Sequence, residues 1–342
     1  MKILREILKS IYSTFHDLNL ERKCHELNAY GFATLSVVNV RTEPRYQAEM
    51  AAQILMGTPV KVHYSPQGTY WMNIETPDGC RGWVNKLAIE LSDEESLSEW
   101  KKSRRLIVIS DYTRFLEDPS PEAQQILDGV AGDIILDTGE QSGQYHKVTV
   151  PDGRTAFVKN EDVSDFETWA NDNYQKSVFA ANGQMTAIAQ VQSDIMATAK
   201  RFVGVPFLWR GASVKGFDCS GFVKYVYFLN GIILPYAVLP MSNVGQEVDI
   251  RNGNERLRPA DLVFFGHEAD SRHPMSIKHV AIYLGNGMIA HSSHFVRVNN
   301  VFDESRPDAY VRKIIAAHRI IGSNGCGLPA QSVWHSNTYF DC

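Results

Sequence analysis

The sequence lacks any long hydrophobic run, because no stretch approaches the roughly 18 apolar residues that a membrane-spanning helix needs. It also lacks an excess of basic residues, and its formal net charge of -5 argues against a dedicated nucleic-acid-binding protein. Cysteine is scarce, with five residues and no C-x-x-C pair, which argues against a disulfide framework and a zinc knuckle. The 342 residues are otherwise of ordinary globular composition and are sufficient for two or three domains.

Residues 1–30 are predicted to form a helical segment, since apolar residues at positions 3, 4, 7, 8, 11 and 15 share one helical face. Arg5, Glu6 and Lys9 interrupt a continuous apolar core, which argues against a secretory signal. We expect a helix docked on the protein body, with a membrane-surface helix as the alternative. The predicted location is cytoplasmic, and a periplasmic or cell-envelope location is the alternative.

Two copies of a small β unit are predicted next, at residues 31–95 and 96–166. Both contain short alternating strands and a hairpin turn with the sequence Pro-Asp-Gly. Each turn is followed a few residues later by an aromatic residue and a valine, and the two turns lie 74 residues apart. This repeat indicates two tandem barrels.

A linker or helix is predicted at residues 167–190, and a last domain at residues 191–342. In this last part, helical patterns are followed by strand-like runs at residues 261–266, 279–285 and 288–293. Helices followed by strands indicate an α+β domain with an antiparallel sheet.

Cys219 stands at the start of a predicted helix, within the sequence KGFDCSGFVKYVYFLNG. Asp218 suits the N-cap position and Gly231 suits the end of the helix. Cys219 therefore falls in the first turn, where free backbone N–H groups and the helix dipole favour a thiolate. A buried structural cysteine is the alternative interpretation.

His279 and His291 are candidates for the base that activates this thiol and for the group that orients the base. A three-residue loop at 285–287 would place the two histidines diagonally on one sheet face, about 7–8 Å apart. A metal cluster of Cys219 with His273, His279 and His291 is a less favoured alternative. Its ligands fall outside the tight spacings of zinc sites.

Three motifs, in this order, resemble those of the NlpC/P60 cysteine peptidases: DCSG at a helix start, DLVFFG on a strand and HVAIYLGNGMIAHSS across a hairpin. The resemblance covers residues 190–322. The preceding units resemble bacterial SH3 domains, and the first looks like that of the branch that cuts γ-D-glutamyl–diamino acid bonds in cell-wall peptides. The resemblance implies a multidomain fold of two small SH3-like β-barrels followed by a papain-like α+β catalytic domain.

The resemblance also implies roles for the motif residues. Cys219 would be the nucleophile, His279 the general base and His291 the polar group that orients the base. Tyrosine or backbone donors near the helix start would supply the oxyanion hole. The reaction would pass through a thioester acyl-enzyme, and no metal or organic cofactor is expected.

Three further residues would bind substrate, which the resemblance identifies as murein-derived peptides with a free N-terminal L-alanine. Asp218 and Ser220 would hold the free amine and the alanine, with helix capping as the alternative for both. Glu49 of the first barrel would close the same pocket, with a solvated surface charge as its alternative.

The chain departs from the family pattern at several positions. The family usually continues R-D-A-S-x-Q after the helix, whereas this chain has Ala237 at the acidic position and Leu239 at the serine position. Cys80 stands where an aromatic residue often follows the first Pro-Asp-Gly turn, and Ala281 replaces a glycine. We predict an endopeptidase with altered substrate positioning. The alternatives are a wall-peptide-binding protein with a weakened peptidase, or an amidase or acyltransferase using the same cysteine and histidine.

Overall fold

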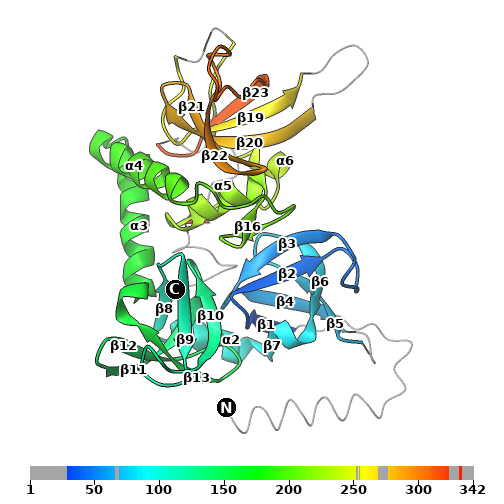
Figure 1. Ribbon diagram of the computed structural model, residues 1–342, viewed down its shortest axis with the longest axis vertical. Coiled ribbons are helices and arrows are strands. Elements are labelled where there is room, and N and C mark those ends of the chain that lie inside the picture. Colours follow the sequence, from blue (N-terminus) through cyan, green and yellow to red (C-terminus); the bar gives the residue numbers. More distant parts are fainter. Residues whose placement is uncertain are drawn as a thin grey trace.

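Figure 1 shows the computed structural model, which describes residues 29–65, 69–251, 253, 255–268, 276–322 and 331–332. The helical segment predicted for residues 1–30 lies outside these residues, except for its last two positions, which begin the first strand. Two sheets lie side by side at one end of the molecule, a third sheet lies at the other end, and helix α5 lies between them.

The first sheet has seven strands in the order β3-β2-β6-β5-β4-β1-β7. They are β1 (Ala29–Ala33), β2 (Val37–Arg41), β3 (Met50–Leu55), β4 (Pro59–Tyr64), β5 (Trp71–Glu75), β6 (Arg81–Asn85) and β7 (Ile89–Ser92), with the short helix η1 (Lys86–Ala88) before β7. Alternation along these strands encloses an apolar cluster that includes Val40, Ile54 and Ile74. This part of the chain therefore has its own core.

The second sheet repeats the same topology, in the order β10-β9-β13-β12-β11-β8-β14. Its strands are β8 (Arg105–Val108), β9 (Tyr112–Leu116), β10 (Gln125–Val130), β11 (Ile134–Ser142), β12 (Tyr145–Thr149), β13 (Thr155–Lys159) and β14 (Val163–Asp165), with η2 (Asn160–Asp162) before β14. Each strand of the first sheet thus has a counterpart seven places later, which confirms the repeat predicted from the Pro-Asp-Gly turns.

The two Pro-Asp-Gly turns join equivalent strands, β5 to β6 and β12 to β13. Gly79 and Gly153 adopt φ values of 83° and 86°, a conformation that an L side chain rarely adopts. Their amides donate to the carbonyls of Thr76 and Val150 at 2.9 and 2.8 Å. Glycine is therefore required in both turns.

Three helices connect these sheets to the rest of the chain: α2 (Glu94–Lys102), α3 (Phe166–Ala181) and α4 (Met185–Arg201). Asp93 caps α2 by accepting the Ser96 amide at 2.8 Å. This helix joins the two sheets and spans the predicted boundary between residues 95 and 96. Helices α3 and α4 lead along one side of the molecule toward the third sheet (Figure 1).

The third sheet has six strands in the order β18-β23-β19-β20-β21-β22. They are β18 (Gln246–Glu247), β19 (Leu262–His267), β20 (Ser276–Gly285), β21 (Met288–Ser293), β22 (Phe295–Asn300) and β23 (Ile314–Arg319). Helices α5 (Cys219–Phe228) and α6 (Val238–Met241) precede it, with two small strand pairs: β15 (Ala212–Ser213) with β16 (Gly216–Phe217), and β17 (Ile232–Ile233) with β24 (Gln331–Ser332).

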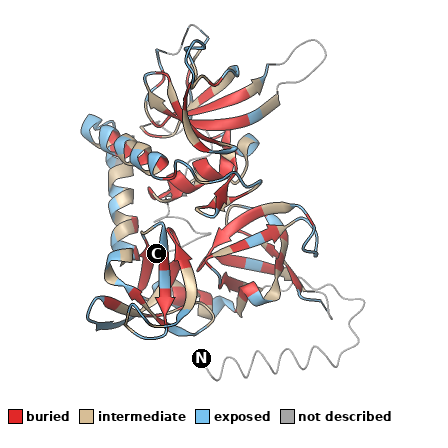
Figure 2. Ribbon diagram, viewed as in Figure 1, coloured by how far each residue is buried: buried red, intermediate tan, exposed pale blue. Residues whose placement is uncertain are grey.

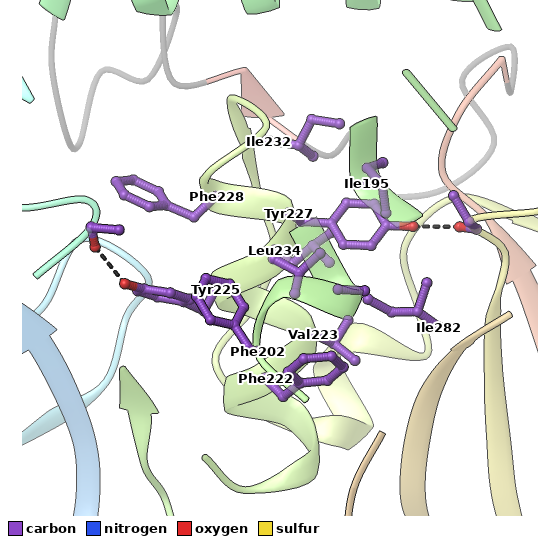
Figure 3. Packing of buried hydrophobic residues seen from close by; sticks show 14 of the residues in the cluster. Ile195, Phe202, Phe222, Val223, Tyr225, Tyr227, Phe228, Ile232, Leu234 and Ile282 are labelled. Carbon is purple, nitrogen blue, oxygen red and sulfur yellow. Dashed lines mark hydrogen bonds between the residues drawn. The ribbon is translucent and has the colours of Figure 1, made fainter. Parts of the chain in front are cut away.

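Helix α5 is the centre of the main hydrophobic core, and Figure 2 shows it buried along its length. Phe222 and Val223 are fully buried in one cluster with Ile195 of α4 and Ile282 of β20 (Figure 3). Two tyrosines of the helix anchor it by hydrogen bonds from their hydroxyls: Tyr225 to the Ala131 carbonyl at 2.5 Å, and Tyr227 to the Ala260 carbonyl. The first residue of this buried helix is thus held in a fixed position.

The sheets and helices confirm the predicted architecture of two small β-barrels followed by an α+β domain. The limits proposed for each domain stay predictions. Within the described residues, no helix is long and apolar enough to cross a membrane.

Candidate active site

Cys219 is the first residue of α5, directly after the capping residue Asp218. One carboxylate oxygen of Asp218 accepts the Gly221 amide at 2.6 Å and the Ser220 hydroxyl at 3.0 Å. The other oxygen accepts the Arg210 amide at 3.1 Å. The capping interpretation of Asp218 is therefore confirmed, while its predicted contact with substrate stays a prediction.

Gly221 lets this helix start approach the preceding loop closely. A Cβ atom at this position would lie 1.9 Å from the carbonyl oxygen of Gly211, far inside the contact distance. The glycine of the DCSG motif is therefore required by the structure, since any larger residue would push the helix start away from the loop.

His279 and His291 contact each other through their rings, as the sequence predicts. His279 Nε2 lies 2.8 Å from His291 Nδ1, and His291 Nε2 lies 2.8 Å from Asn299 Oδ1. Asn299 Nδ2 in turn donates to the Asp308 carbonyl at 2.7 Å, which fixes the orientation of the amide. Sequence reasoning missed Asn299, which lies on β22, beyond the motifs that carry the family resemblance.

This chain of contacts determines the tautomers of both rings. Because Asn299 presents its oxygen, His291 Nε2 carries the proton and its Nδ1 is an acceptor. His279 Nε2 must then donate to His291, which leaves His279 Nδ1 with a free lone pair. A neutral imidazole in this tautomer is ready to act as a base.

The β20–β21 hairpin keeps both histidines on one face, although its turn differs from the predicted one. Tyr283 pairs with Ile289, in the predicted register. Gly285 pairs with Met288, however, which leaves a two-residue turn at 286–287 in place of a three-residue loop. An irregularity before Gly285 restores the register, so the shorter turn does not move the histidines to opposite faces.

Cys219 lies close to β20, near enough for the Val280 amide to favour the thiolate form. Burial nevertheless raises the pKa of the Cys219 thiol to about 12, and the nearby Asp218 carboxylate adds to the rise. The predicted lowering of the thiol pKa by the helix start is therefore outweighed by burial. Burial also lowers the pKa of His279 to about 3 and that of His291 to about 4.

With these pKa values, the thiol and both imidazoles are neutral at pH 7. Proton transfer from Cys219 to His279 would create two opposite charges together. Their attraction offsets part of the cost that burial imposes on each charge alone. A standing thiolate on Cys219 is therefore disfavoured at pH 7.

Tyr310 completes the wall of the site and was also missed by sequence reasoning. Its ring centroid lies 4.4 Å from that of His291 and 5.5 Å from that of His279. Burial raises the pKa of Tyr310, and the nearby Cys219 thiolate would raise it further. The residue comes from the irregular segment between β22 and β23, which has no periodic pattern to identify it.

The first barrel contacts the loop before Cys219. The exposed Glu49 accepts a hydrogen bond from Trp209 Nε1 at 2.6 Å. Gln53 Oε1 accepts the Ala212 amide at 2.8 Å, and Lys224 of α5 forms a buried ion pair with Asp78. Glu49 and Asp218 therefore both bind the short segment that contains residues 209 and 210.

The loop that departs from the family pattern lies beyond α5. Ala237 occupies the N-cap position of α6 without a capping side chain, and Leu239 is 63% exposed. Tyr236 packs against the core of the first barrel. Residues 236–240 carry no charged side chain. Within the described residues, no group of three or more His, Cys, Asp or Glu side chains is arranged to hold a metal ion, and His273 lies outside those residues.

Comparison with known proteins supports the family and the domain types that the motifs predict. The NlpC/P60 family matches residues 204–314, and the bacterial SH3 domain matches residues 36–90. Fold and motifs together define an α+β domain of the cysteine-peptidase class behind SH3-like barrels. The chain belongs to the NlpC/P60 family, which confirms the resemblance drawn from its three motifs.

Two relatives and one solved structure are informative. The chain is 35% identical to the gamma-D-glutamyl-L-lysine dipeptidyl-peptidase of Bacillus subtilis (strain 168). The 248 aligned residues cover 70% of this chain and 71% of that protein. A protein of the same name from Bacillus cereus is 30% identical over 244 residues, covering 71% of this chain but only 65% of its own length. The crystal structure of an NlpC/P60 family protein from Bacillus cereus ATCC 10987 has the same fold, with a TM-score of 0.65 at 22% identity, covering 85% of this chain and 99% of that one.

Proposed function

We propose that this protein is a cysteine endopeptidase that hydrolyses the γ-D-glutamyl–diamino acid bond of murein-derived peptides with a free N-terminal L-alanine. The observation that carries the proposal is the ordered chain from His279 through His291 to Asn299, next to a thiol at a helix start. The substrate class is taken from the relatives named gamma-D-glutamyl-L-lysine dipeptidyl-peptidase.

In this mechanism, His279 Nδ1 takes the proton of the Cys219 thiol as the sulfur attacks the scissile carbonyl carbon. Backbone N–H groups at the start of α5 stabilise the negative oxygen of the tetrahedral intermediate. The imidazolium then gives its proton to the leaving amine, and a thioester to Cys219 remains. Water, deprotonated by His279, attacks the thioester and releases the γ-glutamyl peptide.

Recognition of the free amine is assigned to Asp218, Ser220 and Glu49. Both oxygens of Asp218 already accept hydrogen bonds, but an ionised carboxylate can accept more than one partner at each oxygen. Glu49 is exposed and is held by Trp209 close to the same segment. A buried ammonium needs such partners, because an unpaired buried charge is costly.

Acetylation of the substrate amine tests this recognition. We expect the acetylated peptide to lose about 30-fold or more in kcat/KM, which corresponds to at least about 2 kcal/mol for a broken charged pair. Equal turnover of the acetylated and free peptides would remove the role of Asp218 and Glu49 in amine binding. The cysteine chemistry would be unaffected by that result.

A second function is favoured by one observation, the loss of polar side chains at Ala237 and Leu239. A protein that holds wall peptides but cleaves them slowly would have the same fold and the same cysteine. We expect the peptidase, since the hydrogen-bonded histidines are intact.

The deciding experiment is incubation with L-Ala-γ-D-Glu-L-Lys and L-Ala-γ-D-Glu-diaminopimelate, followed by mass spectrometry. The proposal predicts L-Ala-γ-D-Glu and the free diamino acid, and no product from the Cys219→Ala variant. Tight binding by both proteins without product would instead support the binding function. A cytoplasmic location, in keeping with a small released substrate, remains part of the proposal, and recovery in the envelope fraction of cells would contradict it.

A further inference from the structure

Two arginines face the candidate site from the sheet and from the segment that follows it. Arg297 stands directly opposite His291 in the β21–β22 pairing, so both side chains leave the same face. The Arg312 guanidinium lies 5.5 Å from the ring centroid of Tyr310, which itself packs on both histidines. Both positive charges lower the pKa of His279 and of His291, as expected for cations close to the pair.

Neither cation has an acidic partner among the residues that the structure describes. The Nε atom of Arg297 is buried and, within the same residues, makes no hydrogen bond. By contrast, Arg306 and Arg319 pair with carboxylates, those of Asp308 and Asp261. A buried donor without an acceptor is costly, so a functional reason for it is expected.

The hydroxyl of Tyr310 is a third donor at the same place. It is buried and makes no hydrogen bond within the described part of the chain. Tyr310 and Arg312 also line an open cavity of about 630 Å³. Space for a ligand thus adjoins Tyr310 and the exposed Arg312, and Tyr310 in turn packs on both histidines.

We propose that Arg297, Tyr310 and Arg312 form a carboxylate-binding subsite that holds an anionic group of the substrate next to the scissile bond. Guanidinium groups suit carboxylates because their N–H donors match the two oxygens. This inference rests on the proposed function for the identity of the substrate, and it adds the residues that would select it.

An anion at this place would also assist the proposed chemistry. The two arginines oppose formation of an imidazolium on His279, since like charges repel. A bound carboxylate would offset that repulsion and so ease the transfer of the thiol proton. Cleavage would then be linked to the presence of the correct anionic substrate.

A substrate such as L-Ala-γ-D-Glu-L-Lys has two carboxylates close to the scissile bond. One is the α-carboxylate of the γ-linked D-glutamate, and the other is that of the diamino acid. Residues 236–240, beyond α5, have no charged side chain to meet either of them. The subsite would fit both groups, so the test must separate them.

Binding of three peptides to the Cys219→Ala protein, measured by calorimetry, makes this separation. The peptides are L-Ala-γ-D-Glu-L-Lys, its D-isoglutamine analogue and its lysinamide analogue. We expect Arg312→Met and Arg297→Met each to weaken binding of the first peptide by about tenfold or more. At least one amidated analogue should bind the Cys219→Ala protein weakly, and the arginine substitutions should not weaken its binding further. The carboxylate that is amidated in this analogue is the one that the subsite binds.

Tyr310→Phe provides a second variant that keeps the charge and the ring packing, and we expect a loss of about fivefold to tenfold for the same peptide. Arg154→Met, in the second barrel, removes the same charge far from the site and should change nothing. Circular dichroism checks that all variants are folded.

Several results would overturn the subsite. These are equal weakening of all three peptides by the site variants, tight binding of both amidated analogues, a similar effect of Arg154→Met, or no binding of any peptide. Failure of the proposed function looks different. Binding would depend on the carboxylate and on these residues, yet the protein with Cys219 intact would release no product from any peptide.

Discussion

The two barrels share one strand order, yet they contact helix α5 in different ways. The first barrel uses polar side chains: Asp78 forms a buried ion pair with Lys224, and Gln53 accepts the amide of Ala212 just before the helix. The second barrel presents the Ala131 carbonyl to Tyr225, within a continuous apolar core. Both barrels add apolar residues to this core, but the first also presents charged and amide side chains, whereas the second presents a backbone carbonyl.

The repeated Pro-Asp-Gly turn shows this difference at a single residue. In the first barrel the Asp78 side chain is 2% exposed, because α5 covers it. In the second barrel the equivalent Asp152 is 25% exposed and pairs with the neighbouring Arg154. Identical turn sequences thus acquire different roles from their surroundings. Predictions that contrast the two regions follow, from the largest effect to the smallest.

The largest contrast is expected between Cys219 and Tyr225, two residues of one helix. Replacing Cys219 with alanine should lower kcat/KM for L-Ala-γ-D-Glu-L-Lys by about 10⁴-fold or more, since the nucleophile is lost. Tyr225→Phe should leave turnover within about threefold but cost about 1 kcal/mol or more of unfolding free energy, because the Ala131 carbonyl loses its donor. Turnover assays and urea unfolding measure both.

The control for this contrast is the stability of the cysteine variant, which should stay within about 1 kcal/mol of the parent, since one sulfur atom is removed from the edge of the core. If Tyr225→Phe reduced turnover as strongly as Cys219→Ala, the division between a chemical and a structural part of α5 would be wrong.

The second contrast compares the two aspartates of the repeated turn. Asp78→Ala should reduce the free energy of unfolding by about 3 kcal/mol, because it removes the carboxylate from a buried ion pair. Asp152→Ala should cost less than about 1 kcal/mol, since its partner Arg154 is half exposed. Urea unfolding of both variants tests this, and equal losses would show that burial does not separate the two turns.

The third prediction concerns Asn299, which acts through His291. Asn299→Ala should lower kcat by about 10- to 100-fold with little change in KM, because His291 loses the acceptor that sets its tautomer. Asn299→Asp retains an acceptor and should recover part of the activity. Steady-state kinetics separates the two parameters, and equal loss in both variants would reduce Asn299 to a packing role.

The sequence was sufficient to predict the parts of the site that carry a local pattern. The position of Cys219 follows from a helix start, and the shared face of the two histidines follows from the alternation along a hairpin. The predicted register of β20 with β21 is correct although the turn has two residues in place of three. An irregularity between Tyr283 and Gly285 accounts for the difference and keeps the apolar face of both strands inward.

Other parts of the site could not be predicted because they depend on long-range packing. Tyr310 comes from an irregular segment, and Arg297 and Asn299 acquire their roles from the strand opposite. The thiol pKa was predicted to fall from the helix start alone. Burial, which sequence does not give, reverses that direction.

The smallest contrast is in how the free energy of unfolding depends on pH, which we expect His279 and His291 to affect and Tyr225 not to affect. Unfolded histidine binds a proton below a pKa of about 6.5, whereas burial holds the pKa of His279 at about 3 and that of His291 at about 4. Between pH 8 and pH 5.5 the unfolded state therefore gains protons that the native state does not, and the free energy of unfolding must fall. The expected fall is about 1.4 kcal/mol for each histidine.

Urea unfolding of the parent and of the His279→Gln, His291→Gln double variant at both pH values measures the difference. Tyr225→Phe should not change this dependence, because burial raises the pKa of Tyr225 well above this range. If the parent and the double variant lost stability equally, the two histidines would not be neutral in the folded protein.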